Sequence, residues 1–272
     1  VGRYAGLLPS HANWNFGTFG IDANSDNMIN PTFDNRYNPG QWRVDAKDGD
    51  WKFENIYQMN YFLKNVLPKW KNNQILGNSE NVAHYIGEAY FLRAYEYFNK
   101  LQNLGDFPIV KDVYNDGDKQ ALINASMRSP RNEVARFILS DLDSAITLLK
   151  SASPDGKKQR ISKNVALLMK SRVALYEGTW LKYFKGTAFV PNGPNWPGKN
   201  KAFTANYNYP LGSIDNEINY FLDQAMGAAK TVADNILLVE NSGIIESPNN
   251  ENPYFSMFGA VDMSGYSEVL LW

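Results

Sequence analysis

The sequence contains no cysteine and only two histidines, His11 and His84. Without a thiol, the chain cannot form a disulfide, a thiol nucleophile or a cysteine-ligated zinc site. The two histidines lie far apart, and no third ligand accompanies either of them at a metal-site spacing. The nucleophile motif of serine hydrolases, the phosphate-binding P-loop and the glycine pattern of dinucleotide-binding folds are also missing. No catalytic residue is therefore predicted, and we expect a protein that is not an enzyme and needs no cofactor.

An excess of charge of one sign is also missing, because 27 basic side chains face 28 acidic ones and the net charge is −1. The chain therefore has no basic surface excess for binding nucleic acid or an anionic membrane. No apolar run is long enough to span a bilayer, and no secretory signal starts at Val1. Both ends fall within segments that look structured, so we expect the chain to be truncated at both ends.

Aromatic residues, in contrast, are plentiful. They make up 14% of the chain, with 16 Tyr and 7 Trp. Many lie in two polar segments rich in Gly, Pro and Asn, residues 9–50 and 186–212, whose turn chemistry predicts long irregular loops. Long loops in compact domains are usually functional or disordered, and the interleaved aromatic residues indicate order. The alternative for most of these rings is packing between helices.

Elsewhere, hydrophobic residues recur at helical spacing. Capping residues mark the starts of the first, third and fourth predicted helices, and a proline at the first helical position supports the third. The predicted helices begin at Trp51, Ser79, Ser129, Ser162 and Ile214, and the second and fifth end at Leu104 and Ala233. Short turns join the first helix to the second and the third to the fourth, which predicts two antiparallel hairpins.

Because one hairpin cannot bury both of its faces, neighbouring hairpins are expected to stack. The predicted fold is therefore mainly α, with tetratricopeptide-like stacked helical hairpins and long irregular loop insertions. We expect a single domain over residues 1–272. It would have a loop-rich ligand-side region at 1–50, two hairpins at 51–185, and a loop, the fifth helix and an irregular segment at 186–272.

Four stretches resemble the SusD/RagB family in the same order along the chain. Residues 88–98 read EAYFLRAYEYF and residues 105–110 read GDFPIV, similar to the family pattern E-A-x-F-L-R-A-x-x-Y-F followed by G-D-x-P-L-V. The next two predicted helices and the fifth resemble the helices that follow in the family, in residues 128–145, 160–180 and 220–229 with 268–270. The chain thus resembles the N-terminal and central portion of a family member.

The resemblance implies a lipoprotein on the extracellular face of the outer membrane of a Gram-negative bacterium. It implies non-catalytic binding of oligosaccharide through surface loops and delivery to a SusC-like TonB-dependent transporter. Membrane attachment would be only through a lipid anchor, which is absent from this chain, and part of the ligand site would lie in a missing C-terminal portion. The alternatives are peptide capture on the same scaffold, a helical-repeat protein–protein adaptor, or a cryptic glycoside hydrolase.

A glycan site needs an exposed aromatic ring beside planar polar groups, because sugars present apolar C–H faces and many hydroxyls. Residues 34–42 read DNRYNPGQW and supply all of these in one loop. We predict that Trp42 and Tyr37 contact glycan, with Arg36 and Asn38 beside them. The alternative is that Trp42 anchors the loop to the scaffold.

Trp196 is a further candidate for glycan binding. It lies in the loop at 186–212 together with Tyr207 and Tyr209. For this group the alternative, packing of the loop, is the favoured interpretation.

Asp22, Asn24 and Asp26 alternate like the front half of a calcium-binding loop. The glycine of the sixth position is missing, and Phe33 stands where the bidentate glutamate belongs, so an EF-hand is excluded. A looser calcium site is the remaining expectation, and no other metal is predicted.

Arg93 lies within the apolar stripe of the second helix, near Glu88 and Glu96. It is predicted to be either a buried, paired arginine that orients helix packing or an exposed one. The family resemblance favours the structural role.

Overall fold

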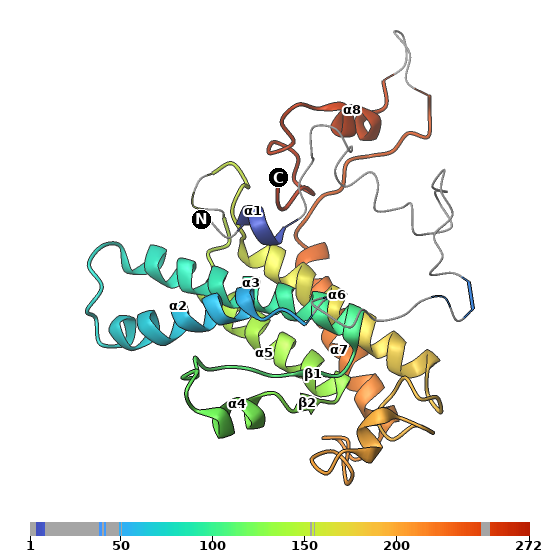
Figure 1. Cartoon of the computed structure of the whole chain (residues 1–272). Helices are drawn as coiled ribbons and strands as arrows, with labels where there is room; N and C mark the ends of the chain where they lie inside the picture. The colour runs from blue at the N-terminus through green and yellow to red at the C-terminus, as the bar shows by residue number, and fades with distance from the viewer. Residues whose placement is uncertain are drawn as a thin grey trace. The chain divides into compact units, whose positions relative to one another are not determined.

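The computed structural model describes residues 4–8, 38–39, 41, 49, 51–152, 154, 156–245 and 251–272. The chain divides into two compact units, Val1–Glu54 and Asn55–Trp272. The described part of the first unit contains the short helix α1 (Tyr4–Leu7). The second unit holds the helical framework (Figure 1).

The second unit is mainly α-helical, and all five predicted helices are confirmed. They are α2 (Glu54–Lys71), α3 (Ser79–Leu104), α5 (Arg131–Leu148), α6 (Lys163–Tyr183) and α7 (Ile214–Ala233). Shorter elements lie between and after them: strands β1 (Phe107–Pro108) and β2 (Arg128–Ser129), helix α4 (Lys119–Ala125), the 3₁₀ helix η3 (Pro197–Asn200) and helix α8 (Pro253–Gly259). None of the helices that the structure describes is both long and apolar enough to cross a membrane.

The ends of α3 are determined by local capping. At its start, the side-chain oxygen of Asn78 accepts a hydrogen bond from the N–H of Asn81 at 3.0 Å. At its end, Gly105 has a φ of 70°, the left-handed conformation that glycine adopts without steric cost.

The start of α5 differs from the prediction. Ser129 belongs to β2, and Pro130 is the capping residue, which has no side-chain donor or acceptor. The first N–H of the helix, that of Arg131, donates instead to Asp106 Oδ1 at 2.8 Å. A carboxylate from the turn after α3 therefore replaces the predicted serine cap, and it links α5 to that turn.

The helices form antiparallel pairs, as predicted (Figure 1). In the α2–α3 hairpin, Arg93 Nη1 donates to Asn60 Oδ1 at 2.7 Å. The second hairpin consists of α5 and α6, and α6 packs along α7 over a long interface. The two hairpins stack through α3 and α5, where the rings of Tyr97 and Phe137 meet edge to face at 4.9 Å. This is the tetratricopeptide-like arrangement.

The main core lies where α3, α5 and α6 meet. Its fully buried side chains include Ile86, Tyr97, Leu101, Ile138, Leu142 and Leu181. Burial of each stabilises the fold by roughly 1.5–3 kcal/mol. One glycine permits close packing of α6 against α7: a Cβ added at Gly178 would lie 3.0 Å from Leu222 Cδ2, so an alanine there would require the Leu222 side chain to shift by a few tenths of an ångström.

Candidate functional site

The first predicted glycan site lies almost wholly outside the described residues. Arg36, Tyr37 and Trp42 are outside them, so their glycan contacts stay predictions. Asn38 is described and exposed, and its carbonyl accepts the N–H of Gln41 at 3.1 Å.

The calcium candidates Asp22, Asn24 and Asp26 also lie outside the described residues. Among the residues that the structure does describe, no group of three or more His, Asp or Glu side chains could hold a metal ion. His84 is fully buried, its Nδ1 accepts the N–H of Lys150 at 3.1 Å, and its Nε2 lies 3.3 Å from Glu88 Oε1. This histidine therefore packs between helices.

Trp196 belongs to the segment between α6 and α7, residues 184–213, which we call the α6–α7 loop. Its side chain is only 2% exposed, and its indole N–H donates to Asp106 Oδ2 at 2.8 Å. The ring covers Gly198, where an added Cβ would lie 2.2 Å from it. Trp196 therefore has no ring face open to a sugar, and loop packing, its stated alternative, describes this residue.

Tyr207 and Tyr209 hold the inner side of the same loop. Asn132 of α5 donates to the Tyr207 hydroxyl at 2.7 Å, and the Tyr209 hydroxyl donates to the carbonyl of Pro191 at 2.6 Å. Burial raises the pKa of both hydroxyls, so they remain protonated donors. These two rings support the loop from within.

The N-terminal half of α5 anchors α6, α7 and the loop through buried charges. Arg131 binds Glu177 of α6 with Nη2–Oε2 and Nε–Oε1 distances of 2.8 and 3.0 Å. One turn further on, Arg136 binds Glu217 of α7 with Nε–Oε1 and Nη2–Oε2 distances of 2.6 and 2.8 Å. Both glutamates are completely buried and engaged by arginine. Neither is placed to act as the acid or base of glycoside hydrolysis.

Burial by itself would lower the pKa of Arg131, but Glu177 reverses this effect and the pKa is raised. The guanidinium carbon also lies 4.0 Å from the centre of the Trp180 ring, a cation–π contact. The charged form of Arg131 is thus stabilised on two sides, which makes this end of α5 rigid.

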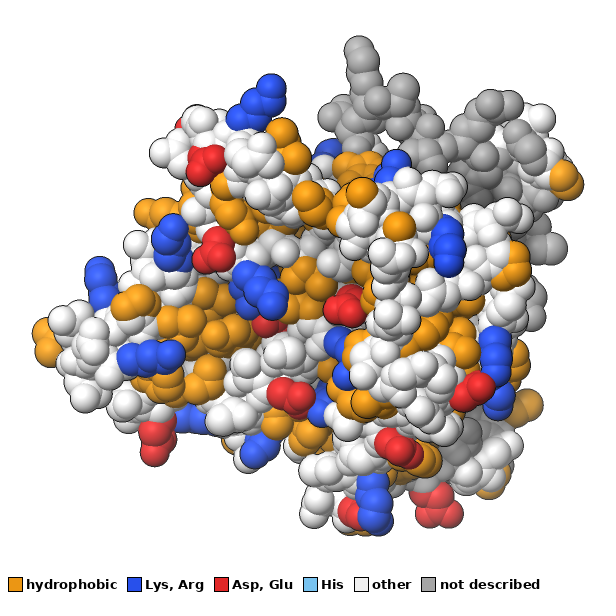
Figure 2. All heavy atoms as spheres, turned by 90° about the horizontal axis from the view of Figure 1, so that it is seen from below, with side chains coloured by type: hydrophobic (Ala, Val, Ile, Leu, Met, Phe, Trp, Pro, Cys, Tyr) orange, Lys and Arg blue, Asp and Glu red, His pale blue; other side chains and the backbone are white. Residues whose placement is uncertain are grey.

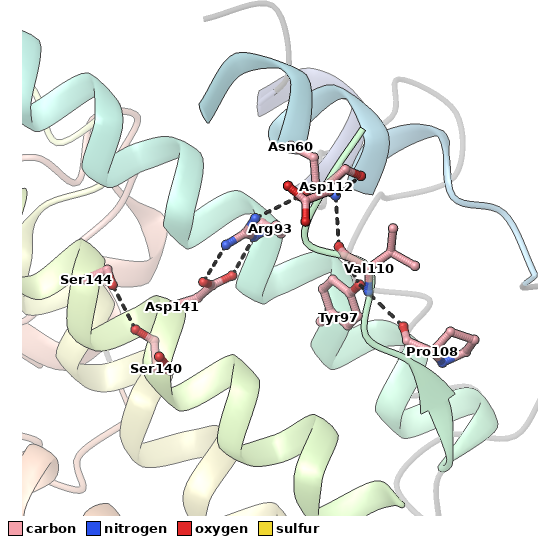
Figure 3. Close-up of polar contacts among 9 residues, drawn as sticks. All are labelled: Asn60, Arg93, Tyr97, Pro108, Val110, Asp112, Ser140, Asp141 and Ser144. Carbon is pink, nitrogen blue, oxygen red and sulfur yellow. Dashed lines mark hydrogen bonds and ion pairs between the residues drawn. The ribbon is translucent and has the colours of Figure 1, made fainter. Parts of the chain in front are cut away.

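A second buried arginine links the two hairpins (Figure 3). Arg93 Nε and Nη2 each donate to one oxygen of Asp141 at 2.7 Å, and its Nη1 donates to Asn60 Oδ1. Asn60 in turn donates to the carbonyl of Val110 at 2.8 Å. The buried, paired alternative for Arg93 is confirmed, but its partner is Asp141 of α5, because Glu88 pairs with Arg160 and Glu96 with Lys100.

The outer side of the α6–α7 loop is aromatic and open to solvent. A series of neighbouring rings runs along the end of α6: Trp180 and Phe184 lie 4.4 Å apart, and Phe184 and Phe189 lie 5.4 Å apart. Phe189, at the end of the series, is 61% exposed. The Trp180 indole donates to the carbonyl of Phe189 at 3.1 Å, which holds the turn that carries this ring.

An exposed hydrophobic side chain is not unusual on this protein. On the face drawn in Figure 2, hydrophobic side chains cover broad areas between separate Lys, Arg, Asp and Glu side chains. Phe189 differs because its ring packs edge to face against Phe184 and its carbonyl is held by the Trp180 indole. Asn192, which is exposed, follows in the same loop. Phe189 and Phe203, which is 47% exposed, were missed because sequence reasoning favoured Trp and Tyr. Their position in the loop at 186–212 was the available signal.

Residues 5–175 match the model of the SusD-like family, which is described as starch-binding and associating with the outer membrane. SusD-like protein P2 of Formosa agariphila is 30% identical over 124 residues, which cover 44% of this chain and 23% of that protein. A SusD-like protein of Bacteroides fragilis has a similar structure, with a TM-score of 0.52, 18% identity, and coverage of 79% of this chain and 31% of that one.

A SusD homologue of Bacteroides thetaiotaomicron aligns with a TM-score of 0.45 and 19% identity, covering 68% of this chain and 29% of that one. The chain therefore spans about a third or less of the length of each of these relatives.

Proposed function

Because this chain belongs to the SusD-like family, we propose that it binds oligosaccharide at the bacterial cell surface without cleaving it. The family description, starch-binding and associating with the outer membrane, supports both the ligand class and the location. The buried, arginine-bound state of Glu177 and Glu217 supports binding over hydrolysis, since neither carboxylate is open to a substrate.

The observation that carries the proposal in the described structure is the open ring of Phe189. A ring that is held from behind and exposed in front can stack on the C–H face of a sugar without a large loss of side-chain freedom. The side-chain nitrogen of Asn192 donates to the carbonyl of Tyr207 at 2.8 Å, and its side-chain oxygen could accept a hydrogen bond from a sugar hydroxyl. Trp196 contributes to this surface indirectly, by holding the loop to Asp106.

The proposal includes the loop before α2. There, Trp42 and Tyr37 would stack on the glycan, and Arg36 and Asn38 would bond to its hydroxyls. Together with the α6–α7 loop, these residues would provide aromatic surfaces on two separate loops.

The remaining parts of the proposal concern the whole protein. It would be attached by a lipid anchor to the extracellular face of the outer membrane of a Gram-negative bacterium, and it would deliver its glycan to a SusC-like TonB-dependent transporter. The partner would be the transporter, and no nucleic acid would be bound.

The test is native electrophoresis in gels that contain soluble starch or another neutral polysaccharide, with Trp42→Ala as the variant. Wild type should be retarded, and the variant should be retarded less. Trp272→Ala is the matched control, because Trp272 is a half-exposed tryptophan at the far end of the chain.

Three results would contradict parts of the proposal. Equal retardation of wild type and Trp42→Ala would remove Trp42 from the site. Release of reducing sugar during incubation would contradict binding without cleavage. If no polysaccharide retards wild type but a peptide library does bind, the ligand class would change to peptide.

A further inference from the structure

A second surface, distinct from the α6–α7 loop, has the size and lining of a ligand site. It is an open groove of about 600 Å³ between α2, α3, α5 and the start of α7, and we call it the helix groove. Its volume lies in the range of small-molecule sites, roughly 300–1,000 Å³. Because the groove is open to solvent and not enclosed, a ligand longer than the groove could lie in it and extend into solvent.

Three aromatic side chains from three different helices line the helix groove: Trp70 of α2, Tyr90 of α3 and Tyr220 of α7. All three are partly buried, so their rings are held in place while part of each remains accessible. The Tyr220 ring is stacked by the Arg136 guanidinium, whose carbon lies 3.9 Å from the ring centre. Arg136 is itself held by Glu217, so ring and guanidinium form a rigid unit before any ligand arrives.

Helix α5 contributes polar groups to the lining. Ser140 and Asp143 both line the groove and are exposed. A lining that mixes rings with hydroxyl and carboxylate groups suits a ligand that is itself both apolar and polar on each face. Leu67 and Leu148 also line the groove, but the polar side chains that α5 contributes make it less suited to the apolar face of a helix.

Three charged side chains line the groove: Arg136 and Asp143 are paired within the protein, and Lys71, at the end of α2, is exposed. Arg136 is paired with Glu217, and Asp143 accepts a hydrogen bond from Lys170 at 2.7 Å. A strongly acidic ligand would therefore gain little from Arg136, and a basic one little from Asp143. Apart from Lys71, the lining is uncharged or paired, which suits a neutral ligand.

We propose that the helix groove binds a neutral oligosaccharide, as a second glycan site on the helical framework. The proposal takes the class of ligand from the proposed function but places it on different residues. Trp70, Tyr90 and Tyr220 would stack on successive sugar rings. Arg136, Ser140 and Asp143 would bond to their hydroxyls.

The test is isothermal titration of the whole chain with three neutral oligosaccharides, maltoheptaose, laminarihexaose and xylohexaose, and with an acidic one, an oligogalacturonate. Trp70→Ala should weaken binding of a neutral oligosaccharide at least about tenfold, the effect of losing one well-placed ring. Ser140→Arg, on an exposed side chain, should have a similar effect by filling the groove. Tyr57→Ala is the control, because Tyr57 is a 49% exposed ring on the same helix but outside the groove.

The possible outcomes separate the two sites. Loss of binding in Trp70→Ala and Ser140→Arg, with Tyr57→Ala unchanged, supports the groove. If Ser140→Arg binds like wild type while substitution of Phe189 or Trp42 weakens binding, the groove is not a glycan site. The proposed function would remain. Absence of binding to all four sugars overturns both. Tighter binding of the oligogalacturonate than of the neutral sugars contradicts the neutral ligand.

Discussion

The N-terminal half of α5 and the outer side of the α6–α7 loop are both rich in groups that could bind a sugar, but they use these groups in opposite ways. At the start of α5, Arg131 and its partner Glu177 are buried and bonded to each other. In the outer loop, Phe189 is positioned by its neighbours and exposed to solvent. Residue type alone does not separate the two regions. The two regions differ in whether their side chains are buried and bonded to other groups of the protein or exposed to solvent.

The same contrast occurs inside the loop itself. Trp196, the residue best suited by type to stack on a sugar, is buried against Asp106. Phe189, a less obvious choice, has the open ring. The loop thus divides its aromatic residues into inner rings that hold it to α5 and outer rings that are available to a ligand.

The largest effect is expected from Glu177→Gln at the start of α5. The substitution removes the carboxylate that the buried Arg131 guanidinium binds, which should lower the free energy of unfolding by about 3–5 kcal/mol. Urea denaturation followed by circular dichroism measures it. The control is Lys185→Ala, which breaks the exposed Lys185–Asp215 pair and should cost less than about 1 kcal/mol. Similar losses in both variants would mean that the buried pair has no special role.

A smaller loss of stability is expected from Trp196→Phe. The phenyl ring keeps most of the packing but cannot donate to Asp106, so the free energy of unfolding should fall by about 1–3 kcal/mol. Proteolysis within the α6–α7 loop should become faster, because one of its inner attachments is gone. A variant as stable and as resistant to protease as wild type would show that the loop is held by other contacts.

A pH effect should distinguish the buried framework from exposed surface. Burial raises the pKa of the Tyr97 hydroxyl, whose ring is completely buried. Above about pH 10, the unfolded chain releases this proton while the folded chain keeps it. The stabilisation is therefore complete below that pH and declines above it, by up to about 1.4 kcal/mol per pH unit. Urea midpoints at pH 9 and pH 11 measure the decline, and Tyr97→Phe should show a smaller one. An equal decline in wild type and Tyr97→Phe would show that Tyr97 does not cause this loss of stability.

The long helices could be predicted because their signals are local. The limits of α3 and α7 follow from capping residues and from hydrophobic spacing within each segment. The strands β1 and β2 could not be predicted this way, since Phe107 pairs with Ser129 across a loop. Helix α4 has no buried residue and therefore no hydrophobic stripe to reveal it.

For the candidate site, sequence pattern identified the loop at 186–212 but not which of its rings is open. The direction of a ring depends on distant partners, such as Asp106 for Trp196 and Asn132 for Tyr207. The partner of Arg93 was missed for the same reason: Asp141 lies on another helix, whereas the two glutamates nearby in sequence have other partners.

The most direct test of this division between held and open rings compares Phe189→Ala with wild type in the starch-containing native gel. We predict binding at least about fivefold weaker, from the loss of one stacking ring, in a protein of unchanged stability. Phe189→Tyr, which keeps the ring, should bind like wild type. Equal retardation of Phe189→Ala and wild type would contradict the claim that the open ring of the α6–α7 loop contacts glycan.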